Sequence, residues 1–266
     1  MVTQFKDYFS KQANDYRNYR PHYPESLFEY LAALVPHRQA AWDCATGNGQ
    51  VALGLTRHFK KIYATDASEK QISHAFDHDK INYSVAVAEK VGLGNQSIDL
   101  ITVAQAVHWF NLEKFYQEVQ RVSKPGGIIA LWGYWYFEFP PEENHIDQIS
   151  RNFFTTVVDQ YWPEEIKLLL QNYQTIPFPF AELKTPLLTM ETQWNMEEFL
   201  GYLTTWSAIQ KLIAVQSHEP ILEFSNRLVE AWGDPERKII FQWPLHLRVG
   251  RIHSNSTTCE VQISGF

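Results

Sequence analysis

The first half of the chain contains a glycine turn with one acidic residue before it, Asp43, and one after it, Asp66. The segment Asp43-Cys44-Ala45-Thr46-Gly47-Asn48-Gly49 follows a short apolar stretch and precedes a helical pattern. Glycines let a backbone bend sharply and let a ligand approach it, and the N–H groups that open the next helix attract negative groups. Asp66 ends the next apolar stretch, where an acid can accept hydrogen bonds from both hydroxyls of a ribose. These residues predict a nucleotide-type site; the alternative is an ordinary strand-to-helix turn beside an exposed acid.

The charge of Asp43 bears on which ligand fits. Gly47, Gly49 and Ala52 have the spacing of a dinucleotide fingerprint, G-x-G-x-x-G/A. A carboxylate at Asp43 would repel a pyrophosphate and attract a ligand that carries an ammonium or sulfonium group. The charge therefore favours S-adenosylmethionine over NAD.

Alternating strand and helix patterns position these residues in the first half of the chain. Strands are predicted at 40–42, 61–65, 81–87, 99–104 and 127–132, with helices at 24–35, 51–59, 69–76 and 112–122. Strands separated by helices in this way form right-handed βαβ units and a parallel sheet covered on both faces. We expect a doubly wound α/β fold.

The pattern changes after residue 133, where prolines and aromatic residues become frequent. Helices are predicted at 143–158, 163–173, 195–214 and 221–232, with strands at 186–191 and 243–252. We interpret residues 1–133 as the core with an N-terminal arm, 134–240 as an inserted helical cap that contains one core strand near 186–191, and 241–266 as the final strands and a tail. The aromatic residues of the cap either fill its core or line an apolar pocket.

Further motifs extend the pattern over about residues 5–135. They are Tyr16…Arg20-Pro21…Tyr23-Pro24, Thr65-Asp66-Ala67-Ser68, Ala88-Glu89, Gln105-Ala106-Val107-His108-Trp109-Phe110 and Arg121-Val122-Ser123-Lys124-Pro125-Gly126-Gly127. Together with the glycine turn, the chain resembles the class I S-adenosylmethionine-dependent methyltransferases, of the type related to ubiquinone-biosynthesis and trans-aconitate methyltransferases. Residues 201–208 and 247–251 resemble the trans-aconitate-like branch.

The resemblance implies a Rossmann-like, mostly parallel sheet of seven strands with the helical cap, and S-adenosylmethionine as cofactor. It implies methyl transfer to a small-molecule acceptor, either a carboxylate or an aromatic or apolar metabolite. Two positions depart from the family pattern: Ala45 replaces the first glycine, and Val87 stands where an Asp often binds the adenine amino group. The expected cofactor-binding residues are Asp43, Ala45, Gly47, Gly49, Asp66, Ala67, Ala88, Glu89, Gln105, Tyr16 and Arg20.

The catalytic and substrate residues are less specified by the sequence. His108 either acts as a base or substrate contact, or caps the end of a strand and orients the site. Arg17, Arg20 and Arg151 are candidates to pair with a carboxylate substrate. The expected substrate-pocket residues are Trp109, Trp135, Tyr136, Tyr202 and Trp206.

Composition excludes several other functions. The formal net charge of −7 would repel a phosphate backbone, so nucleic acid is not expected as a main partner. Cys44 and Cys259 fit no metal or redox spacing, and we expect no metal. Without a signal-peptide pattern or a long apolar run, a cytoplasmic location is expected. A non-catalytic S-adenosylmethionine-binding regulator and an NAD-linked oxidoreductase remain alternatives, and the oligomeric state has no signal in the sequence.

Overall fold

The computed structural model describes residues 21–253, so the expectations for Tyr16, Arg20 and the tail from 254 onward lie outside the described residues. The chain forms two units. Among the described residues, the sheet unit contains 25–133, 175–186 and 247–253, and the helical unit contains 21–24, 134–174 and 187–246. Each unit is therefore built from several separate segments.

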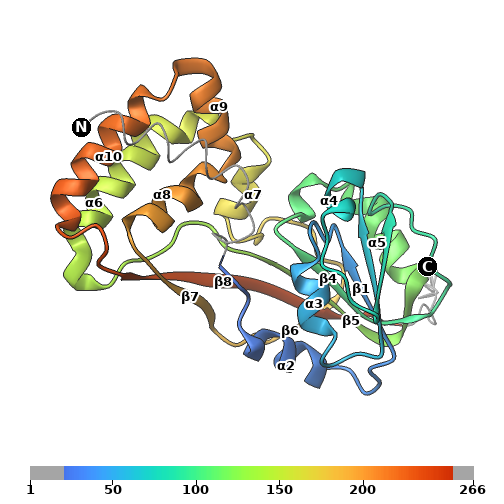
Figure 1. Ribbon diagram of the computed structural model, residues 1–266. Coiled ribbons are helices and arrows are strands. Elements are labelled where there is room, and N and C mark those ends of the chain that lie inside the picture. The colour runs from blue at the N-terminus through green and yellow to red at the C-terminus, as the bar shows by residue number, and fades with distance from the viewer. Residues whose placement is uncertain (1–20, 254–266) are drawn as a thin grey trace, which may run out of the picture. The chain divides into compact units, whose positions relative to one another are not determined.

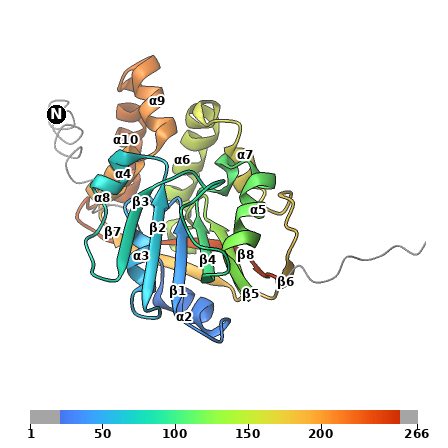
Figure 2. The ribbon, with the colours of Figure 1, turned by 90° about the vertical axis from the view of Figure 1, so that its right-hand side faces the viewer.

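Five parallel strands form the centre of the sheet unit. They are β1 (Ala40–Cys44), β2 (Lys61–Asp66), β3 (Ile81–Val85), β4 (Ile98–Ala104) and β5 (Ser123–Gly133), in the order β3-β2-β1-β4-β5. Figure 2 shows β3, β2, β1 and β4 side by side. Every residue of β1 is buried, as in a parallel sheet with helices on both faces.

Helix α2 (Glu25–Ala33) precedes β1. The helices α3 (Gln50–Leu55), α4 (Glu69–Ser73) and α5 (Leu112–Val122) connect β1 to β2, β2 to β3 and β4 to β5. Figure 1 shows α3 and α5 on opposite sides of the sheet. On α5 the side chains of Phe115, Val119 and Val122 are fully buried, and the Asn111 side chain caps its first turn by accepting a hydrogen bond from the Lys114 N–H. The prediction of an α/β Rossmann-like fold is confirmed.

The sheet differs from the expected seven strands because of one long strand. Strand β8 (Ile239–Arg251) pairs antiparallel with β7 (Leu188–Trp194) through its first half and with β6 (Ala181–Leu183) through its second half. Among the described residues the sheet therefore has eight strands and is mixed. The strand expected at 186–191 begins two residues later, and it pairs with β8 in the helical unit.

The helical unit contains short helices around a core of aromatic rings. Its helices are η2 (Pro141–Glu143), α6 (Asn144–Phe153), a π-helical turn η3 (Phe154–Val158), η4 (Asp159–Tyr161), α7 (Ile166–Leu170), α8 (Met196–Thr204), α9 (Ser207–Gln216) and α10 (Glu219–Trp232). Stacking of Phe153 on Phe224, with ring centroids 4.3 Å apart, joins α6 to α10. The helix expected over 195–214 is two helices, α8 and α9, because the chain turns out of helical geometry at Trp206.

Residues 175–186 return to the sheet unit, although we expected one continuous cap from 134 to 240. Arg248 on β8 holds this segment: its guanidinium donates hydrogen bonds to Glu182 at 2.9 and 3.1 Å and to the carbonyl of Ile176 at 2.7 Å. It also lies 4.6 Å from the centre of the Phe178 ring. Arg248 is 8% exposed and its hydrogen bond to Ile176 is buried, whereas the side chain of Glu182 is 48% exposed.

We predict that Arg248→Met destabilises the protein by about 2–4 kcal/mol, because it removes a buried cation with several hydrogen bonds and leaves the Ile176 carbonyl without this donor. Urea unfolding measures the change. Arg57→Met is the matched control, since Arg57 pairs with Glu25 at the surface with 72% of its side chain exposed. It should cost about 0.5 kcal/mol or less. Equal losses of unfolding free energy in the two variants would show that the contacts of Arg248 do not hold residues 175–186.

Candidate functional site

The order of the strands reverses between β1 and β4. Strands β2 and β3 continue from β1 in one direction, and β5 continues from β4 in the other. Open α/β sheets bind ligands at the carboxyl ends of the strands at such a reversal. Asp43 and Asp66 lie at the carboxyl ends of β1 and β2, and Gln105 directly follows β4, so the structure brings these three predicted residues to the same edge.

Asp43 lies at this edge with both oxygens of its carboxylate hydrogen-bonded. One oxygen, Oδ2, accepts hydrogen bonds from the hydroxyl of Thr46 and from the N–H of Ala52 at 3.1 Å. The other, Oδ1, accepts from the hydroxyl of Thr102 at 2.9 Å, and Thr102 is opposite Asp43 in the register of β1 and β4. Asp43 is 1% exposed. The carboxylate therefore ties the glycine turn and the start of α3 to strand β4.

The burial of Asp43 makes its charge costly. Burial raises its pKa to about 6, whereas the hydrogen bonds from Thr46, Thr102 and Ala52 lower it and the nearby Asp66 carboxylate raises it further. Near neutral pH Asp43 is still ionised. A cation that binds close to it would relieve part of this cost, which agrees with the charge argument made from the sequence.

Asp66 holds the same turn from strand β2. Its Oδ2 accepts a hydrogen bond from the N–H of Gly47 at 2.9 Å, and its Oδ1 accepts from the N–H of Ser68 at 2.8 Å. A carboxylate oxygen has room for a second hydrogen bond, and Asp66 is partly exposed beside the exposed Ala67. The two oxygens can therefore accept from two neighbouring hydroxyls of a ligand.

The glycine turn contains three left-handed residues, each with a different surrounding. The φ angles are 55° at Ala45, 57° at Gly47 and 85° at Gly49. A Cβ at Gly47 would meet no described atom within 4 Å, so space is open there. At Gly49 it would lie 2.1 Å from the hydroxyl of Tyr83, which itself donates to the carbonyl of Phe76. Gly47 therefore leaves room for a ligand, and Gly49 is required by Tyr83.

The segment after β4 is strained as well. Gln105 has a φ of 56°, and its N–H donates to the carbonyl of Trp132 at 2.9 Å. Left-handed conformations of residues other than glycine cluster at functional sites. In the following turn η1 (Val107–Trp109), His108 is 7% exposed and packs on Trp109, which is 55% exposed. The dual interpretation of His108 stays a prediction.

The segment after β3 contains the predicted adenine contacts. Ala88 is buried, Val87 is half exposed, and Oε1 of Glu89 accepts a hydrogen bond from the N–H of Asn111 at 2.7 Å. Glu89 therefore joins this segment to the start of α5. Whether Glu89 also contacts a ligand stays a prediction.

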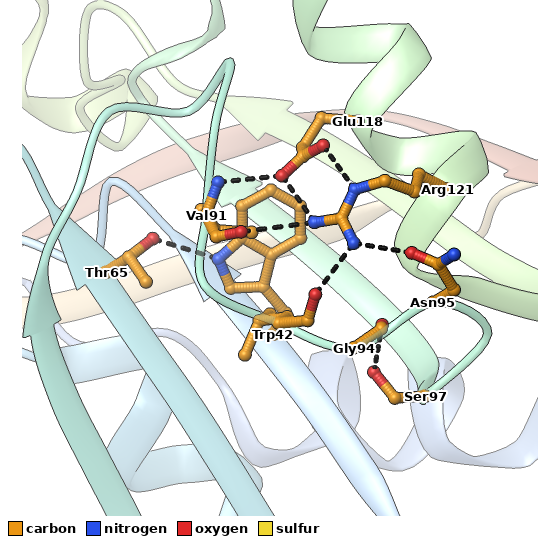
Figure 3. A network of polar contacts seen from close by, with 9 residues as sticks. Trp42, Thr65, Val91, Gly94, Asn95, Ser97, Glu118 and Arg121 are labelled. Carbon is orange, nitrogen blue, oxygen red and sulfur yellow. Dashed lines mark hydrogen bonds and ion pairs between the residues drawn. The ribbon is translucent and has the colours of Figure 1, made fainter.

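A second network fixes the end of the same segment (Figure 3). The Arg121 guanidinium donates to Glu118 at 2.7 Å, to the carbonyls of Val91 and Leu93 at 3.1 and 2.8 Å, and to Asn95 at 2.7 Å. Glu118 in turn accepts from the N–H of Val91, and these hydrogen bonds lower its pKa. Sequence reasoning missed this pair, although a Glu three residues before an Arg on a helix was a visible signal.

The structure divides the predicted substrate residues between the two units. Trp109 belongs to the sheet unit, whereas Trp135, Tyr136, Tyr202 and Trp206 belong to the helical unit. The ring of Trp206 lies 5.7 Å from Tyr202 and 6.1 Å from Tyr136, and Trp206 is 8% exposed. Trp206 and Tyr202 therefore pack as core side chains, while Trp135 and Tyr136 are only half-buried.

Residues 21–253 contain no group of three His, Cys, Asp or Glu side chains placed as metal ligands would be. None of the helices in the same range combines the length and apolar character needed to cross a bilayer.

We predict that Ala45→Gly stabilises the protein by about 1 kcal/mol, which corresponds to about 2–4 °C in melting temperature, because glycine adopts a positive φ without strain. Thermal unfolding followed by circular dichroism measures the shift. Ala32→Gly, inside helix α2, is the control and should lower stability, since Ala32 is buried in regular helix. A loss of stability in both variants would contradict the strain at Ala45.

Comparisons with known proteins identify the family of this chain. Residues 42–131 match the family model described as "Methyltransferase domain", a range that includes the glycine turn, Asp66 and Gln105. A protein of Dictyostelium discoideum that is named as a methyltransferase is 30% identical over 241 residues, which are 90% of this chain and 92% of that protein. A protein of Saccharomyces cerevisiae that is named as an S-adenosylmethionine-dependent methyltransferase is 30% identical over 47% of this chain and 46% of its own length.

A solved structure is similar as well. A protein from Anaeromyxobacter dehalogenans, described as a type II methyltransferase, superposes with a TM-score of 0.82 and 40% sequence identity over 88% of this chain and 98% of that one. Sequence, fold and site geometry thus lead to the same family. The chain belongs to the class I S-adenosylmethionine-dependent methyltransferases.

Proposed function

We propose that the edge formed by β1, β2 and β4 binds S-adenosylmethionine and that the enzyme transfers the methyl group to a small-molecule acceptor. The observation that carries this proposal is that Asp43 and Asp66 both accept hydrogen bonds from the backbone of the glycine turn and its helix, while the space beside Gly47 stays free. The residues present suit the cofactor: Asp66 offers two acceptors for a ribose diol, and the buried negative charge of Asp43 favours a cationic ligand.

The remaining residues of the edge have supporting roles in this proposal. Gly47 lets the cofactor approach the backbone, Gln105 flanks it from β4, and the segment at Ala88 and Glu89 faces the adenine. The bound cofactor supplies a methyl group on a sulfonium, which is already an activated leaving group. The protein's contribution is then mainly orientation and exclusion of water, with a base such as His108 needed only for an acceptor that must lose a proton.

Of the two acceptor classes, we propose the aromatic or apolar one. Of the three arginines expected to pair with a carboxylate substrate, Arg151 is the one within residues 21–253. Its guanidinium donates hydrogen bonds to both oxygens of Asp147, at 2.8 and 2.7 Å, on the surface of α6. This helical ion pair already balances its charge. The half-buried aromatic side chains of the helical unit suit an apolar acceptor better than the tricarboxylate of the trans-aconitate-like branch.

We predict that Asp66→Asn weakens S-adenosylhomocysteine binding at least about tenfold, because the amide loses the charge and one acceptor oxygen. Isothermal titration calorimetry measures the affinity. Asp79→Asn makes the same charge change on a side chain that is 89% exposed and should leave the affinity unchanged.

The 2′-deoxy analogue of S-adenosylhomocysteine makes this test specific for the ribose. If Asp66 accepts from the diol, Asp66→Asn should weaken the analogue less than it weakens S-adenosylhomocysteine. Equal weakening of both ligands would limit Asp66 to holding the turn through Gly47 and Ser68.

We predict that the preference for S-adenosylmethionine over S-adenosylhomocysteine falls as the pH drops below about 6. The sign follows from Asp43: its pKa of about 6 means that acid protonates it and removes the negative charge that favours the sulfonium. The two ligands differ in charge only at the sulfur, so the ratio of their affinities, measured by calorimetry from pH 5 to 8, isolates this effect.

Thr102→Val is the matched variant for this pH dependence. It removes a hydrogen bond that lowers the pKa of Asp43, so the midpoint of the change should move to higher pH. An affinity ratio that stays constant from pH 5 to 8 would contradict the role of the Asp43 charge.

A further inference from the structure

Three polar groups of aromatic side chains converge in the helical unit. Trp135 and Tyr136 follow β5, and Trp162 follows η4. The ring of Trp135 lies 5.2 Å from that of Tyr136 and 4.8 Å from that of Trp162. All three side chains are half-buried, in contrast to the fully buried rings of the unit's core. We call these three residues the donor cluster.

Apolar rings surround the donor cluster. Phe154 stacks on Tyr136 with ring centroids 5.5 Å apart and ring planes 8° from parallel. Trp206 lies 5.0 Å from Phe154 and 5.6 Å from Trp162. A molecule that reached the cluster would meet ring faces, which favour flat apolar groups.

The two indole N–H groups are incompletely satisfied. They lie against the hydroxyl of Tyr136 and lower its pKa, but neither forms a well-aligned hydrogen bond with any residue between 21 and 253. Both nitrogen atoms are shielded from solvent. Buried N–H groups in this condition are uncommon and cost stability, so an acceptor atom of a ligand would be well placed to take up their hydrogen bonds.

Tyr136 adds a third donor. Burial raises its pKa to about 12, with a further increase from Asp159, so its hydroxyl stays protonated at any physiological pH. No residue between 21 and 253 accepts a hydrogen bond from this hydroxyl, so its hydrogen is available to a ligand. The cluster therefore offers donors to a ligand and no open acceptor.

The charges near the cluster disfavour an ionic ligand. Among the described residues, the charged groups that act on Tyr136 are Asp159, which raises its pKa, and Arg151, which lowers it. Arg151 is paired with Asp147. A carboxylate at the cluster would therefore face Asp159 with no unpaired cation from residues 21–253 to balance it, and an ammonium group would find only donors.

We propose that Trp135, Tyr136 and Trp162 bind the methyl acceptor, and that this acceptor is a neutral, flat, largely apolar molecule with a hydrogen-bond-accepting oxygen. This inference rests on the proposed function, since it names the acceptor class of the same enzyme. It assigns Tyr136 a binding role and no role as a base, because its proton is held too firmly.

Three probes of similar size and different polar groups test the proposal on the full chain with S-adenosylhomocysteine present. Acetophenone carries a neutral acceptor oxygen, benzoate an anionic one, and 1-phenylethylamine a protonated donor. Heteronuclear NMR spectra that correlate each nitrogen with its bound proton follow the indole N–H signals. The variants Trp135→Phe and Trp162→Phe assign these signals, because each variant removes one of them. We expect acetophenone to shift both signals saturably, benzoate to bind at least about tenfold more weakly, and the amine to leave them unshifted.

Tyr136→Phe is the decisive variant, because it removes the hydroxyl and keeps the ring that stacks on Phe154. It should weaken acetophenone at least about fivefold and leave S-adenosylhomocysteine affinity unchanged. Trp243, another buried indole whose N–H lacks a partner among the described residues, lies in the aromatic core, and its signal should not move. Trp162→Phe provides a second variant should Tyr136→Phe unfold.

Several results would overturn the proposal: no saturable shift with acetophenone, unchanged acetophenone affinity in both Tyr136→Phe and Trp162→Phe, or tighter binding of benzoate or of the amine. Failure of the proposed function would look different, because S-adenosylhomocysteine itself would then fail to bind in calorimetry of the unmodified protein. Binding of S-adenosylhomocysteine without binding of acetophenone rejects only the acceptor assignment.

Discussion

The buried carboxylate of Asp43 is the constraint on which the site depends. A charge with 1% exposure must have hydrogen-bond donors on both oxygens, and the chain supplies them from three elements: Thr46 in the turn, Ala52 in α3 and Thr102 in β4. These donors fix how the turn closes on the edge of the sheet. They do not remove the whole cost of burial, as the raised pKa shows, so a cationic ligand gains from binding here.

The strain at the same edge has a related origin. Ala45 and Gln105, which follow β1 and β4, both have positive φ although neither is glycine. Hydrogen bonds from neighbouring residues stabilise each of these conformations. Asp43 and Asp66 accept hydrogen bonds from the backbone that follows Ala45, and the N–H of Gln105 donates to the carbonyl of Trp132. The Glu118–Arg121 network fixes the segment after β3 in the same manner. These hydrogen bonds hold the backbone on the sides of the edge where a cofactor would need fixed partners.

The sequence predicted the parts of this arrangement that have a local signal. Helix α5 was predicted with its observed bounds, and the glycine turn and Asp66 were placed at strand ends, because the apolar periodicity and the turn residues are local. Thr102 and Tyr83 could not be identified, because their roles depend on register and on packing across strands. The interruption of the predicted cap also has no local signal. Residues 175–186 return to the sheet unit through contacts with Arg248, which lies far along the chain.

The polar chemistry of the two units is complementary to two different molecules. The edge of the sheet unit offers acceptors and negative charge, through Asp66 and Asp43, which suit hydroxyls and a cation. The donor cluster of the helical unit offers only donors among ring faces, which suits a neutral oxygen. A sulfonium needs no strong nucleophile, so an uncharged acceptor is chemically sufficient, and it avoids the large desolvation cost that an anion would have among aromatic rings. The proposed neutral acceptor and the cationic cofactor therefore suit their surroundings for the same reason, that each ligand supplies the polar partner its surroundings lack.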